Sequence, residues 1–118
     1  MDDRLSHLQK RALEFRDERD WEQFHNAKDL AISLSLEAAE VLEMFQWKSL
    51  ASVESLLQDP AFRSRISQEL ADVLIYLLLL SDRLGIDLSK AFAEKMAIND
   101  EKYPVDKAYG RSTKYDEL

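Results

Sequence analysis

Two pairs of carboxylates, Glu37 with Glu40 and Glu69 with Asp72, have a spacing that could build a metal site. The members of each pair are three residues apart, so on an α-helix they lie on the same face about one turn apart. Aliphatic residues flank both pairs, which predicts that both helices are substantially buried at this level. Ionised carboxylates that are buried together repel one another unless a cation lies between them. The pattern therefore favours a shared site for divalent metal ions.

The available ligand atoms narrow the choice of metal. The chain has no cysteine, and neither of its two histidines is near the acidic pairs in sequence. Oxygen ligands alone are typical of Mg²⁺ or Mn²⁺ rather than zinc. A single Glu-x-x-Glu pair is usually solvated surface charge. Two such pairs inside apolar helices are not well explained as surface charge.

Composition predicts a single all-α domain spanning residues 1–118. The 118 residues include only two glycines and two prolines, and 46% are hydrophobic, which favours a few long elements over a many-stranded sheet. The longest apolar run, Val73 to Leu80, is too short to cross a bilayer, which takes about 20 residues. With no export segment and no cysteine, we expect a soluble cytoplasmic protein that does not associate with membranes.

The net charge of −7 excludes some partners. Acidic and basic residues are interspersed, and no basic stripe offsets the negative total. Such a surface repels a nucleic-acid polymer. A small polyanionic substrate remains compatible with the charge, because bound metal ions would neutralise it locally.

Apolar periodicity predicts four long helices and hence a protomer that resembles a four-helix bundle. Their expected limits are Asp3 to about Arg19, the N-cap Asn26 to about Trp47, Asp59-Pro60 to Leu84 with Gly85 as the stop, and the N-cap Asp87 to Tyr103. A short apolar piece within residues 48–59 predicts one or two further helical turns, and residues 105–118 are expected to be an irregular tail. The third long helix is apolar on nearly every side, which predicts a central place or burial against another subunit.

Two polar or aromatic rows follow from these helices. The second helix would align Glu37, Glu40 and Trp47, and would place Trp47 roughly 10 Å beyond Glu40 on the same face. That distance is comparable to the reach from the phosphates of a nucleotide to its base. The fourth helix carries Lys95, Asn99 and Lys102 on one face, although an exposed row of this kind is often only solvated surface.

These motifs together resemble the all-α nucleoside triphosphate pyrophosphohydrolases of the MazG-like superfamily. The two acidic pairs resemble the metal-binding signature of that superfamily. Four further stretches look like its dCTP pyrophosphatase branch: residues 19–25 (Arg-Asp-Trp-Glu-Gln-Phe-His), 42–48 (Leu-Glu-Met-Phe-Gln-Trp-Lys), 72–76 (Asp-Val-Leu-Ile-Tyr) and 95–104 (from Lys95-Met to Tyr103-Pro104). The resemblance covers the chain from about Leu5 to Leu118, apart from residues 49–60.

The resemblance implies Mg²⁺-dependent hydrolysis of dCTP or a related deoxynucleoside triphosphate to the monophosphate and pyrophosphate, serving nucleotide-pool control or sanitising. It implies a homo-oligomer, typically a tetramer. The carboxylates of Glu37, Glu40, Glu69 and Asp72 would hold the metal and serve as the catalytic residues. A water molecule would attack the α-phosphorus, and the sequence does not choose between Glu37 and Glu40 as the group that orients or deprotonates it.

Matching positions also imply how the substrate is held. The implied base pocket contains Trp21, His25, Trp47 and Tyr76, and the implied phosphate contacts are Lys95, Asn99, Lys102 and Tyr103. Some relatives carry a histidine where this chain has Ala12, which leaves the preferred base open.

Geometry adds one expectation about assembly. A short connection makes the second and third long helices antiparallel, so Trp47 and Tyr76 would lie at opposite ends of the acidic cluster within one subunit. Both residues could not easily reach one base from the same chain. We therefore predict that a neighbouring protomer completes each pocket.

Two other classes of protein remain as alternatives. A ferritin-like di-iron bundle also builds its site from intrahelical glutamates, but it uses Glu-x-x-His pairs, and positions 40 and 72 are Glu and Asp here. A non-catalytic helical oligomer that binds nucleotides or a partner protein is the other alternative.

Overall fold

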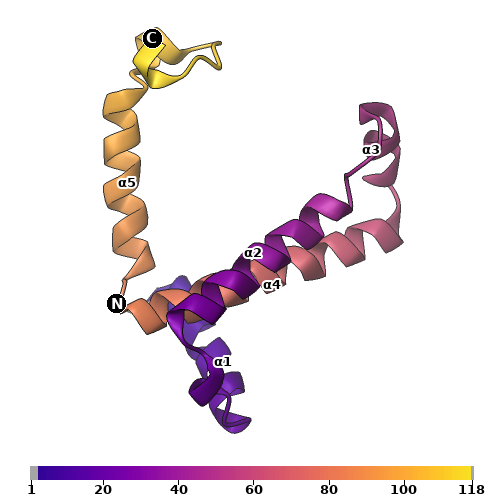
Figure 1. Ribbon diagram of the computed structural model, residues 1–118. Coiled ribbons are helices and arrows are strands. Elements are labelled where there is room, and N and C mark those ends of the chain that lie inside the picture. The colour runs from indigo at the N-terminus through magenta and orange to yellow at the C-terminus, as the bar shows by residue number, and fades with distance from the viewer. Residues whose placement is uncertain (1–2, 118) are drawn as a thin grey trace. The chain divides into compact units, whose positions relative to one another are not determined.

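A computed structural model describes residues 3–117, and every regular element among them is helical (Figure 1). The elements are α1 (Arg4–Glu18), the 3₁₀ turn η1 (Glu22–Phe24), α2 (Ala27–Glu43), α3 (Leu50–Leu56), α4 (Pro60–Leu84), α5 (Leu88–Lys102), α6 (Val105–Ala108) and the 3₁₀ turn η2 (Tyr115–Glu117). The chain divides into two compact units, one ending at Gly85 and one beginning at Ile86. The all-α prediction is confirmed.

Side-chain caps start the helices where the sequence predicted them. The Asn26 side chain accepts a hydrogen bond of 2.8 Å from the backbone N–H of Asp29. Asp59 and Asp87 cap α4 and α5 in the same way, at 3.0 and 3.1 Å. These bonds satisfy backbone donors that have no partner within the helix. At the other end of α4, Gly85 has a φ of 67°, the left-handed conformation that commonly ends a helix.

An antiparallel pair, α2 and α4, forms the centre of the first unit (Figure 1). The most buried apolar side chains belong to this pair and the turn after α2: Leu30, Met44, Leu78 and Leu79. Where α3 joins the two helices, the rings of Phe45 and Phe62 pack edge to face with centroids 5.9 Å apart. This pairing fixes which turns of α2 and α4 face each other.

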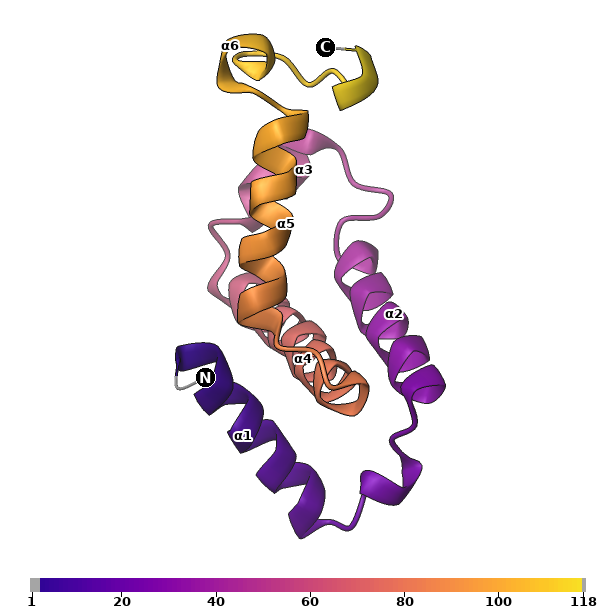
Figure 2. The same ribbon diagram turned by 90° about the vertical axis from the view of Figure 1, so that its left-hand side faces the viewer.

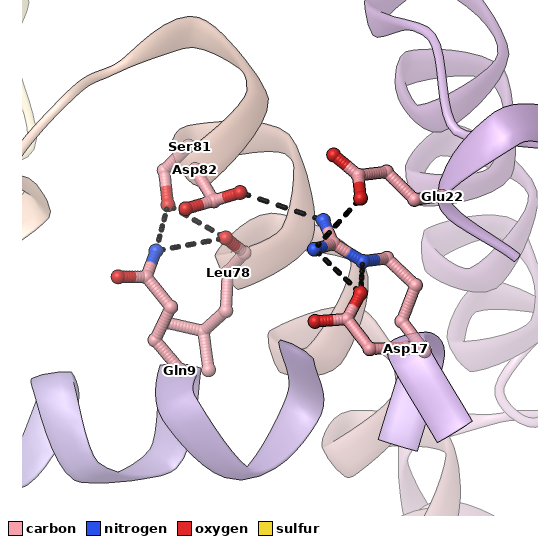
Figure 3. Close-up of polar contacts among 7 residues, drawn as sticks. Gln9, Asp17, Glu22, Leu78, Ser81 and Asp82 are labelled. Carbon is pink, nitrogen blue, oxygen red and sulfur yellow. Dashed lines mark hydrogen bonds and ion pairs between the residues drawn. The ribbon is translucent and has the colours of Figure 1, made fainter. Parts of the chain in front are cut away.

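The helix α1 packs beside the C-terminal half of α4 (Figure 2). The side-chain amide of Gln9 donates to the backbone carbonyl of Leu78 at 2.9 Å and to the Ser81 hydroxyl at 3.0 Å (Figure 3). Ser81 itself is buried, so these bonds satisfy polar groups that water does not reach. They fix α1 against α4 at a defined height.

The end of α2 differs from the prediction. The helix stops at Glu43, and residues 44–47 form a turn in which Met44 is buried and Phe45 meets Phe62. The packing of Met44 and Phe45 goes with a non-helical backbone at residues 44–47. Trp47 then has a φ of 63° and a side chain that is 94% exposed. The prediction that Trp47 continues the helical face of Glu40 was therefore wrong.

The second unit contains α5, α6 and η2. Pro104 ends α5, and the short helix α6 follows at once. The Tyr115 ring lies against Tyr103, with centroids 6.1 Å apart, and the Lys102 ammonium lies 4.6 Å from the centroid of the Tyr115 ring. The segment from residue 105 to 117 is thus partly helical and attached to the end of α5, where the sequence had suggested an irregular tail.

Large apolar side chains remain exposed on the central helices of the first unit. They are Ile32, Leu36 and Leu42 on α2 and Leu70, Ile75, Leu77 and Leu84 on α4. Among residues 3–117, no helix combines the length and the apolar character that a bilayer crossing requires.

Candidate active site

The antiparallel pairing of α2 and α4 brings three of the four predicted metal ligands together. One carboxylate oxygen each from Glu37, Glu40 and Glu69 lies within 4.8 Å of the others. Glu37 and Glu69 are half-buried, whereas Glu40 is exposed. Three acidic groups therefore converge from two helices at one height.

Two oxygens of this cluster are shielded from solvent and have no hydrogen-bond partner among residues 3–117. They are Oε2 of Glu37 and Oε2 of Glu69. Buried polar atoms in native proteins almost always have a partner, so an unpartnered carboxylate oxygen indicates a place for a cation or water. Hard divalent cations prefer such oxygen atoms. The residues present thus fit a divalent metal ion.

The environment disfavours the ionised state of Glu37 and of Glu69. Loss of solvation, then hydrogen bonding to Glu40 and repulsion by the neighbouring carboxylates, raises the pKa of Glu37 from 4.5 to about 7. The pKa of Glu69 is also raised, first by hydrogen bonding to Glu40 and then by burial and repulsion. A bound cation would favour the ionised carboxylates and so lower the pKa of both residues.

Asp72 lies at the edge of the cluster. Its charge contributes to the raised pKa of both Glu37 and Glu69, so it is near them. Its oxygens are not in the converging group, and its side chain lines the adjoining cavity. Asp72 therefore connects the acidic cluster to that cavity.

The cavity beside Asp72 has a volume of about 520 Å³. Its walls come from α1, the residues on either side of η1, and α4, and they include Leu8, Arg11, Ala12, Phe15, Arg16, Trp21, His25, Ala71, Leu74, Ile75, Tyr76, Leu78 and Leu79. Three predicted base-pocket residues, Trp21, His25 and Tyr76, thus share one cavity. Trp47 is not among its lining residues.

His25 has a ring nitrogen that is free to form a hydrogen bond with a ligand in this cavity. Its Nδ1 atom is buried and has no hydrogen-bond partner in the part of the chain that the structure describes. Burial, with a smaller effect from the positive charge of Arg16, lowers the pKa of His25 below 6.5. The imidazole is therefore neutral at pH 7, with one nitrogen that donates and one that accepts.

The predicted phosphate contacts belong to the second unit. Lys95, Asn99 and Lys102 lie on one face of α5, and Tyr103 is its C-cap. Lys95 is exposed, whereas Asn99 and Lys102 are half-buried. The helix thus presents two ammonium groups and an amide in a row, as the sequence predicted.

Sequence reasoning missed Arg16, which is only 8% exposed and lines the cavity. A signal was present, because Arg16 follows Ala12 by four residues on the face of α1 that also carries Leu5 and Leu8. An arginine on the buried face of a helix requires negatively charged or polar partners.

A helical fold, converging intrahelical carboxylates and an adjoining apolar cavity are typical of the all-α nucleotide pyrophosphohydrolases. The sequence profile of the MazG-like family matches residues 32–118. The chain belongs to the MazG-like family.

Named relatives and a solved structure agree with that assignment. Over 114 residues, the chain is 41% identical to dCTP pyrophosphatase 1 of Rattus norvegicus and to dCTP pyrophosphatase 1 of Homo sapiens. Each alignment covers 97% of this chain and 67% of the relative. The crystal structure of a pyrophosphatase from Archaeoglobus fulgidus matches with a TM-score of 0.78 and 40% identity, and covers 88% of this chain and 95% of that one.

Proposed function

We propose that this protein is a nucleoside triphosphate pyrophosphohydrolase that cleaves dCTP or a related deoxynucleoside triphosphate to the monophosphate and pyrophosphate. One observation carries the proposal: carboxylates of Glu37, Glu40 and Glu69 converge, with two buried oxygens unpartnered, beside an apolar cavity lined by aromatic rings. The names of the rat and human relatives support the same reaction.

The acidic cluster is the proposed metal site. Glu37, Glu40 and Glu69 would hold the ion, and Asp72 would complete the set from the cavity side. An all-oxygen site favours Mg²⁺, with Mn²⁺ as a substitute. The bound ion would supply neutralisation of phosphate charge and acidification of water.

Hydrolysis requires an attacking water, a group that accepts its proton, and a leaving group. Water attacks the α-phosphorus, the bond from this phosphorus to the bridging oxygen breaks, and pyrophosphate leaves with that oxygen. One of Glu37 and Glu40 accepts the proton of the attacking water.

The cavity is the proposed base pocket. Trp21 and Tyr76 present flat rings, which stack well on a base. Neutral His25 offers one donor and one acceptor to the edge of that base. The exposed Trp47 is proposed as a further stacking residue, although it lies outside this cavity.

The row on α5 is the proposed phosphate contact. The ammonium groups of Lys95 and Lys102 and the amide of Asn99 are donors of the kind that bind non-bridging phosphate oxygens. Tyr103, at the end of the same helix, would add a hydroxyl.

We further propose that the protein works as a homo-oligomer, with a tetramer as the expected state. The exposed apolar side chains of α2 and α4 support this proposal, because a single chain leaves them in water. An exposed Trp47 is also available to the pocket of a neighbouring protomer. A monodisperse, fully active monomer in light scattering would refute this arrangement. The cytoplasmic location stays a prediction.

A panel of triphosphates tests the reaction. The protein is incubated with each deoxynucleoside triphosphate in Mg²⁺ or in EDTA, and products are identified by ³¹P NMR. Formation of monophosphate and pyrophosphate in Mg²⁺ only, with dCTP among the best substrates, supports the proposal. Release of inorganic phosphate alone, or nucleotide binding without turnover, would refute it, and the latter result would favour the non-catalytic alternative.

A further inference from the structure

The guanidinium of Arg16 lies among three carboxylates near the end of α1, and Figure 3 labels the residues that carry them, Asp17, Glu22 and Asp82. Its side chain is only 10% exposed. The three acidic partners come from three segments: Asp17 from α1, Glu22 from η1 and Asp82 from α4. One side chain therefore bridges all the elements that form the cavity wall.

The contacts of Arg16 differ in strength. Nε donates to Oδ1 of Asp17 at 2.8 Å, and Nη2 lies 2.8 Å from the same oxygen. Nη1 lies 3.5 Å from Oδ2 of Asp82, and Nη2 lies 3.8 Å from Oε2 of Glu22. The bond to Asp17 orients the guanidinium, and the two longer ion pairs attach it to α4 and η1.

The backbone of Arg16 holds the same turn. Its carbonyl oxygen accepts hydrogen bonds from the N–H of Arg19 at 3.2 Å and from the N–H of Trp21 at 3.1 Å. Trp21 also packs edge to face on Phe15, with ring centroids 5.7 Å apart. The position of Trp21 therefore depends on the position of the last turn of α1, which contains Arg16.

Both cavity residues that flank η1 depend on this turn. Trp21 precedes η1 and His25 follows it, and both line the cavity opposite α4. Because Asp82 belongs to the helix that carries Tyr76, the ion pair between Arg16 and Asp82 connects the two walls of the cavity.

We propose that Arg16 is a positioning residue for base recognition, which holds Trp21 and His25 at a fixed distance from the α4 wall of the cavity. The inference rests on the proposed function, in which the cavity takes the base of the substrate. Arginine suits this task because its planar group presents donors in several directions, whereas a lysine ammonium is a point charge on a flexible chain.

Steady-state kinetics tests the inference. The variants are Arg16→Lys, Arg16→Ala and Asp82→Asn, and the control is Lys10→Ala, which removes an exposed cation of the same helix. If the displaced cavity wall weakens base binding by about 1.4 kcal/mol, KM for the preferred triphosphate rises about tenfold, with kcat within about twofold. Preference among bases should fall in parallel. Unchanged KM in Arg16→Ala, or equal losses in kcat for every triphosphate, would overturn the inference.

A fluorescence measurement separates this inference from the enzymatic proposal. The chain has two tryptophans, so Trp47→Phe leaves Trp21 as the single reporter. In this background, Arg16→Ala and Arg16→Lys should make Trp21 more accessible to acrylamide quenching, and Lys10→Ala should not. Unchanged quenching in both Arg16 variants would overturn the inference. If quenching of Trp21 increases in the Arg16 variants but the wild type hydrolyses no triphosphate, the positioning of Trp21 by Arg16 is supported and the proposed function is refuted.

Circular dichroism of each variant checks that it is folded. Arg16→Lys keeps the positive charge, so it remains informative if Arg16→Ala fails to fold. A partial return of base preference in Arg16→Lys relative to Arg16→Ala supports positioning by charge and geometry together. Identical behaviour of Arg16→Lys and the wild type in both kinetics and quenching would overturn the requirement for the guanidinium.

Discussion

Replacing Glu37 with glutamine should stabilise the metal-free protein at high pH. The same change should abolish hydrolysis in the presence of Mg²⁺. Glutamine has nearly the same shape as glutamate, so the change removes the charge without opening a cavity. In the folded protein, the pKa of Glu37 is raised from 4.5 to about 7. Ionising Glu37 is therefore less favourable in the folded state than in the unfolded state.

The pH dependence of this effect has a defined sign. Below about pH 4.5, Glu37 is protonated in both states and contributes no penalty. As the pH rises to about 7, the folded state holds its proton more tightly than the unfolded state, so the wild type loses stability. The full change in pKa corresponds to about 3 kcal/mol, and solvent around this half-buried group reduces it to on the order of 1–2 kcal/mol.

Thermal unfolding in EDTA, at fixed protein concentration, measures the effect. We expect Glu37→Gln to unfold about 3–8 °C above the wild type at pH 8 and at nearly the same temperature at pH 4.5. Glu43→Gln is the matched control, because Glu43 ends the same helix and is exposed. Equal melting temperatures of Glu37→Gln and Glu43→Gln at pH 8 would show that Glu37 is not under electrostatic strain, and would refute this reasoning.

Four further predictions follow from the same structure. Mg²⁺ at a hundredfold excess over its Kd should stabilise the wild type by about 2.7 kcal/mol in thermal unfolding, and Glu37→Gln should lose most of that gain. Because the pKa of His25 is lowered, the folded state should lose stability as the pH falls below 6.5, and His25→Gln should reduce that loss in denaturant titrations. Trp47→Gly should relieve a left-handed backbone and leave the free energy of unfolding unchanged or raised by about 1 kcal/mol, while KM for dCTP rises; a large loss of stability would contradict this. Gly85→Ala should lower the free energy of unfolding by about 1 kcal/mol, because φ is 67° there although a methyl group would meet no atom.

Helix limits could be predicted well because local signals determine them. Asn26, Asp59 and Asp87 cap the helices that they were predicted to cap, and Gly85 ends α4. The end of α2 could not be predicted from local signals. There, burial of Met44 and the contact of Phe45 with Phe62 decide the course of the chain, and these contacts depend on the pairing of α2 with α4.

The candidate site was predictable to a similar extent. The spacing within the pairs Glu37/Glu40 and Glu69/Asp72 predicted a shared site. The antiparallel helices bring together oxygens of Glu37, Glu40 and Glu69, whereas Asp72 lies at the edge of the cluster. Arg16 was missed, although it lies on the apolar face of α1, because two of its three acidic partners, Glu22 and Asp82, come from other segments. Ion pairs between segments leave no periodic signal in a sequence.

Pyrophosphate release from dCTP is the most direct measurement of the central claim, that the converging carboxylates form a metal-dependent hydrolytic site. The wild type and the control Glu43→Gln should release pyrophosphate in Mg²⁺ and not in EDTA, and Glu69→Gln should release none in either while remaining folded. Near-normal release by Glu69→Gln, or equal release by the wild type in Mg²⁺ and in EDTA, would contradict the account.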